Sequence, residues 1–513
     1  MPSQSSMQRK RDAEHLRICF FSDWRIQPLW LAENLISSVT PLDLIVYGGD
    51  DIARLAKAPD GNWLSRISSY ARYGVVVVMG NDDRPADRAL LNVPGVRNIH
   101  ASPTVIAGWG FVGIEGSIYS GEKNKIGFVL HADGKKIERH LRSALKTLDI
   151  PSDRLVIVSH TPPAGCRLDY AQRFGFDQLG SKTLQNFVIK NSPALVLSGH
   201  CHFRGGKHAY LGQTLVVNGA SDDTRIQGTR ASLIELTPDE PPRIVWLDPL
   251  ADSVMSIPDI GVRRAEILRS FGITSLKQLF AAPIEALKAI RFAGPIRTPR
   301  LQAYAHAMTE NTSVWLRKPS IPDKLLFYDV ETGLSTPGLF GPTQEPWMIA
   351  ISDGGETEQW VVPDENHEAR RRMYEEFLEY IRAHPGYTLC SYSGLNFDER
   401  AVMEGLRRWH ETAVDEWLAL SKLDLLREFK QSLVLPTRSW KLKEVAEWCG
   451  YVFDTLDLDG LEVGLLYECY RQLGEPLPVE RIARYNAEDA RALAFIVQWA
   501  REHSPTLATP ECY

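Results

Sequence analysis

Short apolar runs alternate with polar stretches through the first half of the chain. Seven runs rich in Val and Ile each end near Asp, Gly, Asn or His, at 17–21, 42–47, 74–79, 110–114, 155–159, 194–198 and 214–217. Short apolar runs bounded in this way predict buried strands. Between them, 28–38 and 181–190 have helical spacing, and 237–244 predicts a surface hairpin. Strands that alternate with helices predict a layered α/β domain over residues 16–250.

The pattern changes twice beyond residue 250. Residues 255–320 predict short helices separated by Gly and Pro, and a new alternation of strands and helices runs from 324 to 502. Its strongest predicted helices lie near 366–383, 397–409 and 479–501. The expected fold class is therefore α/β multidomain, with two α/β domains joined by a small helical module. Residues 1–15 are polar and lack the apolar core of a signal peptide, so we expect a disordered tail.

Composition narrows the class of protein. With 513 residues, of which 44% are hydrophobic and 24% charged, the chain is expected to be a soluble protein of several domains. Its apolar runs are far shorter than the roughly 20 residues that cross a bilayer, so no membrane association is expected. The seven cysteines show no CxxC spacing, which favours a reducing, cytoplasmic location over a disulfide framework.

The distribution of charge singles out the middle of the chain. The net charge of −6 argues against a uniformly basic surface. Residues 255–320, however, contain ten Lys or Arg against four Asp or Glu, a local charge of +6. A basic centre between acidic domains predicts a grip on a polyanion, with a solvated linker as the alternative.

The predicted strands of the first domain end in residues that can bind metals. The strand ends carry, in order, Asp23 and Arg25, Asp50, Asn81 and Asp82, His160, and finally His200 and His202. Such ends meet at one edge of a sheet, where Asp, Asn and His together can hold two divalent cations against a phosphate. A single Gly-His-x-His fragment would be weak support. Five fragments in this order indicate a two-metal site.

This set resembles the calcineurin-like metallophosphoesterase superfamily over essentially all of 16–250. The resemblance implies that Asp50 bridges two metal ions and that Asp23 and His202 bind the first. It also implies that the second ion is bound by Asn81, His160 and His200.

Two residues depart from the pattern of that family. Arg25 stands where the family has a metal-binding His, and a guanidinium cannot ligate a metal, so we expect Arg25 to contact nucleic-acid phosphate instead. Asp82 stands where many members have a catalytic His, and it could act in proton transfer. These departures leave the binding of the first metal open, and they keep a purely structural domain as the alternative.

The middle module resembles a helix-hairpin-helix motif over residues 257–279. Gly261 has no side chain to hold the backbone away from a phosphate, and the amides of the following helix could point at that phosphate. Arg263 and Arg264 add positive charge, and Gly294 marks a second, looser hairpin. Such contacts position duplex DNA without reading its bases. Protein docking or a spacer role is the alternative.

Three acidic motifs follow in the last domain. Asp329 and Glu331 are two apart in a predicted strand, so they face the same side. Asp398 follows a second predicted strand, and Tyr485 and Asp489 are four apart on a predicted helix, hence on one face. Four carboxylates gathered in one place would repel one another without cations. They therefore predict bound Mg²⁺ or Mn²⁺.

This second set resembles the DEDD exonucleases of the ribonuclease H-like fold, in the subgroup that carries a tyrosine. The resemblance implies two metal ions on the four carboxylates, a water oriented by Tyr485, and 3′–5′ removal of nucleotides. Asp424 is expected to be structural. Trp440 and Lys443 stand in a Trp-Lys-Leu-Lys segment that either meets a nucleic-acid strand or packs as a buried Trp with solvated lysines.

Together these sites predict a metal-dependent nuclease that processes DNA ends in repair, recombination or defence. The expected substrates are single strands or 3′ ends, with duplex held by the middle module, and a helicase or other repair protein is an expected partner. Three alternatives stay open: an RNA-processing exoribonuclease, a DNA-binding scaffold whose inactive first domain docks a partner, and a small-molecule phosphodiesterase with a passenger domain.

Overall fold

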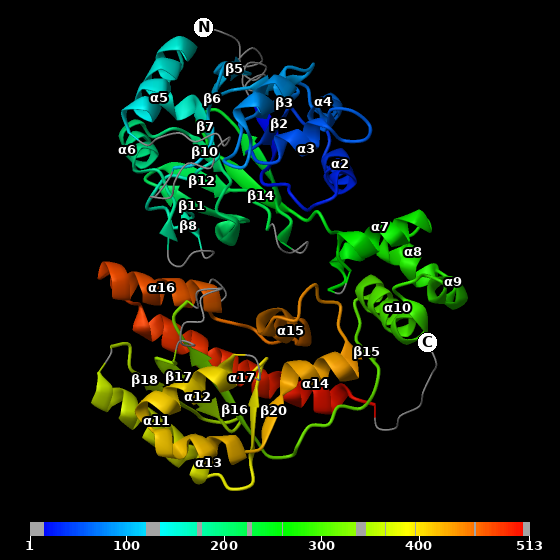
Figure 1. Ribbon diagram of the computed structural model, residues 1–513, viewed down its shortest axis with the longest axis vertical. Coiled ribbons are helices and arrows are strands. Elements are labelled where there is room, and N and C mark those ends of the chain that lie inside the picture. Colours follow the sequence, from blue (N-terminus) through cyan, green and yellow to red (C-terminus); the bar gives the residue numbers. More distant parts are fainter. Residues whose placement is uncertain are drawn as a thin grey trace. The chain divides into compact units, whose positions relative to one another are not determined.

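The chain divides into two compact units, which separate between residues 251 and 252 (Figure 1). The computed structural model describes residues 15–118, 134–171, 177–222, 228–258, 260–334, 345–364, 366–394, 397–455 and 458–505. The tail expected at 1–15 lies outside the described residues except for His15. The helical module expected at 255–320 belongs to the second unit.

The first unit is built on two six-stranded sheets. One has the order β14-β13-β1-β2-β3-β4, formed by Arg243–Leu247, Ala231–Leu236, Leu16–Phe21, Leu44–Tyr47, Val75–Val77 and Val96–Asn98. The other has the order β11-β12-β10-β7-β6-β5, formed by Lys207–Leu211, Thr214–Asn218, Leu195–Ser198, Leu155–Ser159, Trp109–Ile114 and Thr104–Ile106. All seven predicted strands are present, and the predicted hairpin joins β13 to β14.

Alternating side chains of these strands fill two layers of core. In β7, Val156 and Val158 face the core between the sheets, whereas Leu155 and Ile157 face the helices outside. The helices of the second sheet are α5 (Lys135–Leu148) and α6 (Lys182–Asn191). The first sheet is flanked by the helices α2, α3 and α4, which span Leu29–Ser38, Ile52–Ala56 and Trp63–Ile67.

Parallel strands set up the functional edge of this unit. β1, β2 and β3 run parallel in one sheet, and β6, β7, β10 and β12 run parallel in the other. In open α/β sheets ligands bind beyond the carboxyl ends of parallel strands. The polar residues that follow β1, β2, β3, β7 and β10 are therefore brought to the same edge.

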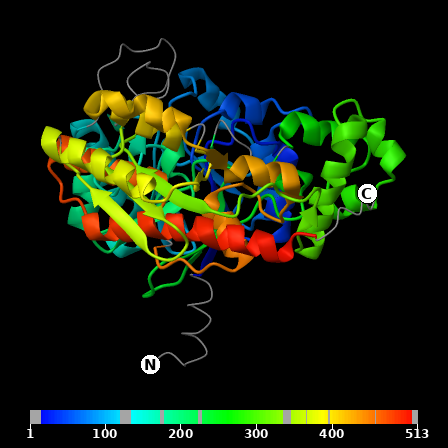
Figure 2. The ribbon, with the colours of Figure 1, turned by 90° about the horizontal axis from the view of Figure 1, so that it is seen from below.

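The second unit contains a five-stranded mixed sheet of order β18-β17-β16-β19-β20. Its strands are Thr357–Val361, Met348–Ser352, Leu325–Glu331, Thr388–Ser391 and Lys422–Asp424, of which the first three are antiparallel and the last three parallel. The helices α11, α12 and α13 (His367–Arg382, Asp398–Trp409, Val414–Ala419) share a core with one face. The helices α16 and α17 (Gly460–Leu473, Val479–His503) share another core with β17, and α17 runs along the sheet (Figure 2).

The helical module packs against this sheet domain within the same unit. It comprises the 3₁₀ turn Val254–Ser256 and the helices α7, α8, α9 and α10, at Val262–Ser270, Leu276–Ala281, Ile284–Lys288 and Gly294–Glu310. The chain then forms β15 (Val314–Trp315), which pairs with β21 (Leu433–Val434) beyond α14 (Leu425–Ser432). No described helix of the chain is both long and apolar enough to cross a membrane.

Candidate metal centres

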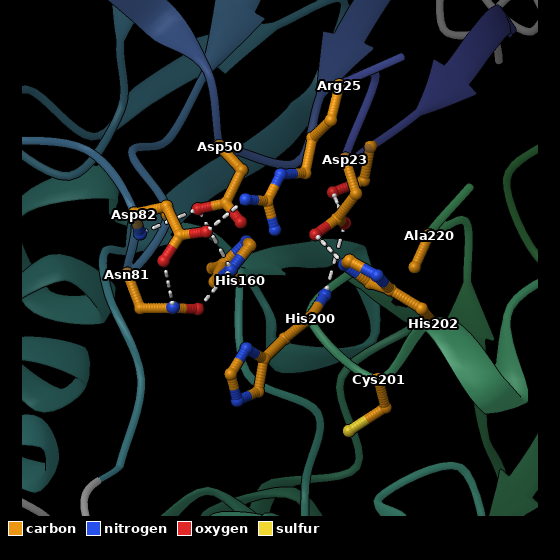
Figure 3. A network of polar contacts seen from close by, with 12 residues as sticks. Asp23, Arg25, Asp50, Asn81, Asp82, His160, His200, Cys201, His202 and Ala220 are labelled. Atoms are coloured by element: carbon orange, nitrogen blue, oxygen red, sulfur yellow. Dashed lines mark hydrogen bonds and ion pairs between the residues drawn. The ribbon is translucent and has the colours of Figure 1, made fainter. Parts of the chain in front are cut away.

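Asp23, Asp50 and His202 form a compact donor cluster in the first unit. Each offers one ligand atom, and the three atoms lie within 4.8 Å of one another (Figure 3). His202 Nε2 is 3.0 Å from Asp23 Oδ1. Both aspartates are buried and have left-handed backbones, with φ of 57° and 69°. Strained backbone outside glycine collects at functional sites, because the surrounding structure must hold it in place.

A second group of donors lies beside Asp50. His160 Nε2, at the end of β7, is 3.0 Å from Asn81 Oδ1 and 3.5 Å from Asp50 Oδ1. His160 Nδ1 donates to the Gly48 carbonyl at 2.9 Å, which orients the ring so that Nε2 points toward Asn81 and Asp50. The ring centroid of His200 is 5.2 Å from that of His160. Asp50 thus lies between the two groups, where a bridging ligand is expected.

Burial and charge set the ionisation of these groups. Burial raises the pKa of Asp50 to about 6, more than the neighbouring His160 lowers it. Burial acts in the same direction on Asp23, but His160 and His202 outweigh it and hold the pKa of Asp23 below its usual value. Burial, with a contribution from His160, lowers the pKa of His200 to about 3. The His200 imidazole is therefore neutral, which is the form that ligates metals.

The two residues that depart from the family pattern form an ion pair with each other. Arg25 Nη2 is 2.6 Å from Asp82 Oδ2. Asn81 Nδ2 donates to Asp82 Oδ1 at 3.0 Å, and the Asp82 amide donates to Asp50 Oδ1 at 3.0 Å. Arg25, Asp50 and Asp82 point toward one another in Figure 3. The charges of the two substituted residues therefore offset each other at the site.

Asp83 is a site residue that the sequence reasoning did not single out. Its carboxylate accepts hydrogen bonds from the backbone amides of Asp50, Ile52 and Gly80, at 3.2, 2.8 and 2.7 Å. Burial, and then the charge of Asp50, raise the pKa of Asp83 to about 8. Asp83 thus ties the loop after β2 to the loop after β3. The two consecutive aspartates after Asn81, Asp82 and Asp83, are the feature of the sequence that could have identified it.

The second unit brings its four carboxylates and one tyrosine to the face covered by α17. Asp329 and Glu331 lie on β16, and Asp398 is the first residue of α12. Tyr485 and Asp489 lie one turn apart on α17, and the Tyr485 hydroxyl lowers the pKa of Asp489. All of these residues except Asp329 are at most 6% exposed. The spacings in the sequence therefore bring the predicted set to one face, where the carboxylates influence one another's ionisation. Their ligand atoms are not gathered as closely as those of Asp23, Asp50 and His202.

These carboxylates suppress one another's ionisation. Burial is the largest cause in each case, and neighbouring carboxylates add to it: the pKa values of Asp329 and Glu331 lie well above their usual range. The pKa of Asp398 is raised to about 8 and that of Asp489 to about 7. Asp489 Oδ1 is buried without a hydrogen-bond partner among the described atoms. An unsatisfied buried acceptor is costly, and a cation would satisfy it.

Two family models match the chain. Residues 66–225 match the metallophosphoesterases of the calcineurin superfamily, and residues 326–501 match the RNase H superfamily. The chain joins a calcineurin-like metallophosphoesterase domain to a ribonuclease H-like domain. The resemblances predicted for the two α/β domains and the fold class are thereby confirmed, and the two domains make the chain a metal-dependent phosphodiesterase or nuclease. No curated protein matches it.

Solved structures with similar folds are distant from this chain. A Thermus thermophilus protein is 20% identical and covers 43% of this chain and 97% of its own, with a TM-score of 0.32. The family B DNA polymerase of Pyrobaculum calidifontis is 16% identical and covers 35% of this chain and 24% of its own, with a TM-score of 0.25. The E. coli exonuclease I–single-stranded DNA complex is 14% identical, with coverages of 32% and 42% and a TM-score of 0.19.

The donor sets of both domains fit divalent metal ions. The metallophosphoesterase domain offers carboxylate and amide oxygens with imidazole nitrogens, a mixture suited to transition metals such as Mn²⁺. The ribonuclease H-like domain offers carboxylate oxygens, which suit Mg²⁺ or Mn²⁺, and one of them is the unpartnered Asp489 Oδ1.

Lys443 lies beside Tyr485 and Asp489 in the ribonuclease H-like site. Its Nζ donates to the carbonyls of Thr455 and Leu458, both at 2.7 Å, and lies 4.7 Å from the ring centroid of Tyr485. Its charge acts on the pKa of Asp489 as an attractive neighbour, lowering it. Lys443 is therefore not the solvated lysine that one interpretation of its segment expected.

Trp440 and Asn486 stabilise the structure around the same site. Trp440 is buried and donates through Nε1 to the Tyr304 hydroxyl of α10 at 3.0 Å, so it packs and does not stack on a strand. Asn486 Nδ2 donates to Asp329 Oδ2 at 2.7 Å and fixes that carboxylate. Asp424 caps α14, as a structural residue would, by accepting from the Arg427 amide.

The helical module places its predicted phosphate contacts at the start of α7. Gly261 is the N-cap of α7, is exposed, and would have nothing within 4 Å of an added Cβ. Arg263 is exposed, and the Arg264 guanidinium lies 5.8 Å from the Phe292 ring. A 3₁₀ turn at Val254–Ser256 precedes the hairpin at Gly261, and α9 and α10 flank the second hairpin at Gly294. No internal packing therefore requires a glycine at 261.

Proposed function

We propose that this protein processes DNA ends, with a 3′–5′ exonuclease site in the ribonuclease H-like domain and a second phosphoesterase site in the metallophosphoesterase domain. The observation that carries the proposal is the set of four carboxylates, of which only Asp329 is partly exposed, on the face covered by α17 and beside Tyr485. Their mutual repulsion is offset when divalent cations bind.

In the exonuclease site the carboxylates of Asp329, Glu331, Asp398 and Asp489 would hold two ions, Mg²⁺ or Mn²⁺. Bound there, such ions lower the pKa of a water and stabilise the leaving 3′ oxygen. The Tyr485 hydroxyl, beside Asp489, would orient the attacking water. Asn486 keeps Asp329 in one orientation, and Lys443 keeps positive charge beside the reacting phosphate.

In the metallophosphoesterase site we assign Asp23, Asp50 and His202 to the first metal. We assign Asn81, His160 and His200, together with Asp50, to the second metal. Their arrangement in two groups on either side of Asp50 supports this division. Arg25 would contact the substrate phosphate, and Asp82 is placed to act in proton transfer. This site would open a blocked end or remove a terminal phosphate.

We further propose that the helical module grips the DNA backbone. Gly261 and the amides at the start of α7 would receive a phosphate, and Arg263 and Arg264 would add charge. The exposed, open surroundings of Gly261 support this role. RNA as the substrate is the second candidate, because the exonuclease site itself does not distinguish the two polymers. A cytoplasmic location and a helicase partner remain predictions.

Cleavage of end-labelled oligonucleotides tests the proposal. The parent protein with Mn²⁺ or Mg²⁺ is expected to give a 3′–5′ ladder on DNA, and Asp489→Ala should reduce its rate at least about a hundredfold because a ligand is lost. His160→Ala should leave the ladder intact and remove any second activity. A ladder that survives Asp489→Ala would refute the exonuclease assignment, and a marked preference for matched RNA would replace DNA by RNA.

If His160→Ala matches the parent on every substrate, the metallophosphoesterase domain is a scaffold and not a catalyst. Turnover of a cyclic nucleotide but of no oligonucleotide would favour the small-molecule alternative.

A further inference from the structure

Asp82 is held in the metallophosphoesterase site as a bound anion would be. Its Oδ2 receives the Arg25 guanidinium at 2.6 Å, and its Oδ1 receives the Asn81 amide nitrogen at 3.0 Å. One carboxylate therefore engages a cationic donor with one oxygen and a neutral donor with the other. Arginine and amide donors that converge on an oxyanion are the usual elements of a phosphate receptor.

This pair of donors lies at the outer side of the buried ligands. The side chains of Arg25 and Asp82 are 29% and 35% exposed, whereas Asp50 and His160 are buried. The same Asn81 side chain turns its Oδ1 toward His160, at 3.0 Å, while its Nδ2 faces Asp82 (Figure 3). The receptor thus borders the atoms assigned to the second metal.

We propose that Arg25 and Asn81 Nδ2 form a subsite for the terminal phosphate of a nucleic-acid end, and that Asp82 occupies this subsite until the phosphate displaces it. The inference rests on the proposed role of this domain in phosphoester chemistry and names its substrate class. Asp82 is an internal competitor that selects for a strongly charged group.

The charges of the competing groups explain that selection. A carboxylate and an internal phosphodiester each carry a single negative charge, so the diester gains little over Asp82. A terminal phosphate carries a charge of about −1.5 to −2 and has three strong acceptor oxygens. A partly exposed ion pair such as Arg25–Asp82 favours the paired state by a factor of only a few in its equilibrium constant. A terminal phosphate can therefore displace Asp82.

Calorimetric titration with inorganic phosphate, at pH 7.5 with Mn²⁺ present, tests the displacement. Asp82→Asn should bind phosphate about fivefold more tightly, because the competing charge is gone. Arg25→Met should bind it at least about tenfold more weakly, because the charged donor is lost. Asp51→Asn is the matched control: Asp51 adjoins the site and pairs with Arg54 at 3.6 Å, so phosphate affinity should change less than about twofold.

A competition arm tests the substrate class. In an Asp489→Ala background, which lacks the proposed exonuclease activity, oligonucleotides with a 5′- or 3′-phosphate should displace inorganic phosphate, and the same oligonucleotides with hydroxyl ends should not. Equal gains in Asp82→Asn and Asp51→Asn, parent-like binding by Arg25→Met, or competition by hydroxyl-ended strands would each overturn the inference.

The cleavage assays are read separately, so the two proposals fail separately. A retained 3′–5′ ladder with a failed phosphate titration removes only the subsite. The expected phosphate pattern without turnover at this domain supports the subsite and removes only the proposed activity.

Discussion

At the scale of single residues, both centres place several carboxyl groups out of water. In the ribonuclease H-like domain the pKa of Asp398 is about 8 and that of Asp489 about 7, because burial and neighbouring carboxylates oppose ionisation. Without metal these groups stay protonated at a pH where an exposed aspartate is charged. The site therefore exchanges protons for metal ions, and its stability must depend on pH.

The metal-free protein is expected to lose stability as pH rises from about 4 to about 8. Because the native-state pKa values of Asp398 and Asp489 are raised, the folded protein binds more protons than the unfolded chain across that window. The stabilising contribution is complete below pH ~4 and is lost as pH passes through 7 to 8. Denaturant unfolding in EDTA at pH 5.5 and 8.5 measures the loss, which should exceed about 1 kcal/mol.

Asp398→Asn supplies the comparison for that measurement. The variant cannot ionise at this position, so its unfolding free energy should change less between the two pH values than that of the parent. An identical pH dependence in parent and variant would show that the carboxylate cluster does not control stability.

Gly80→Ala tests the metallophosphoesterase site with one added carbon. The new Cβ would lie 1.8 Å from Asp50 Oδ1 and 2.5 Å from the Asp50 amide, both too close for contact. The bridging carboxylate must therefore move, and Mn²⁺ binding at this domain should weaken at least about tenfold. Calorimetry in an Asp489→Ala background isolates this site, and unchanged Mn²⁺ affinity would mean that Asp50 is not a ligand.

At the scale of elements, strand ends were the part of the fold that sequence predicted best. The apolar runs have lengths and boundaries that indicate buried strands. The polar residues at the ends of these strands could therefore be assigned, in chain order, to the metal site. Asp329 and Glu331 reach one face because a strand alternates its side chains, and Tyr485 and Asp489 meet because a helix repeats every 3.6 residues.

Contacts between loops and between elements were beyond that reasoning. The Arg25–Asp82 pair joins residues from two different loops, and Lys443 reaches Tyr485 from the start of α15 (Leu442–Cys449). Neither contact joins residues at a short, regular spacing in the sequence, so the sequence did not predict them. The 3₁₀ turn at Val254–Ser256, which precedes the predicted hairpin, also has no local spacing that would predict it.

Gly261→Ala tests the proposed DNA grip at the start of α7. An added Cβ meets nothing within 4 Å, so the melting temperature should stay within about 2 °C of the parent. Duplex DNA affinity, measured by fluorescence anisotropy, should fall about three- to tenfold, because the Cβ holds a phosphate away from the helix amides.

Gly460→Ala is the control for that substitution. Gly460 also begins a helix, α16, and also has open space around an added Cβ. The control should bind DNA as the parent does. Equal affinities in parent, Gly261→Ala and Gly460→Ala would leave the module as a spacer or protein-docking element.

At the scale of the whole molecule, the chain carries two chemically different centres in two separate units. The helical module belongs to the unit of the proposed exonuclease site, where Trp440 and Tyr304 join it to the sheet domain through a buried hydrogen bond. A grip on DNA by this module would therefore act first on substrates of the exonuclease site. The metallophosphoesterase domain has its own ligands and depends on none of these contacts.

The most direct test of this account is anomalous diffraction from crystals soaked in Mn²⁺. We expect manganese peaks beside Asp50 in the first unit and among Asp329, Glu331, Asp398 and Asp489 in the second. Soaked crystals with no peak at the four carboxylates would contradict the central claim that this site is a metal-dependent nuclease.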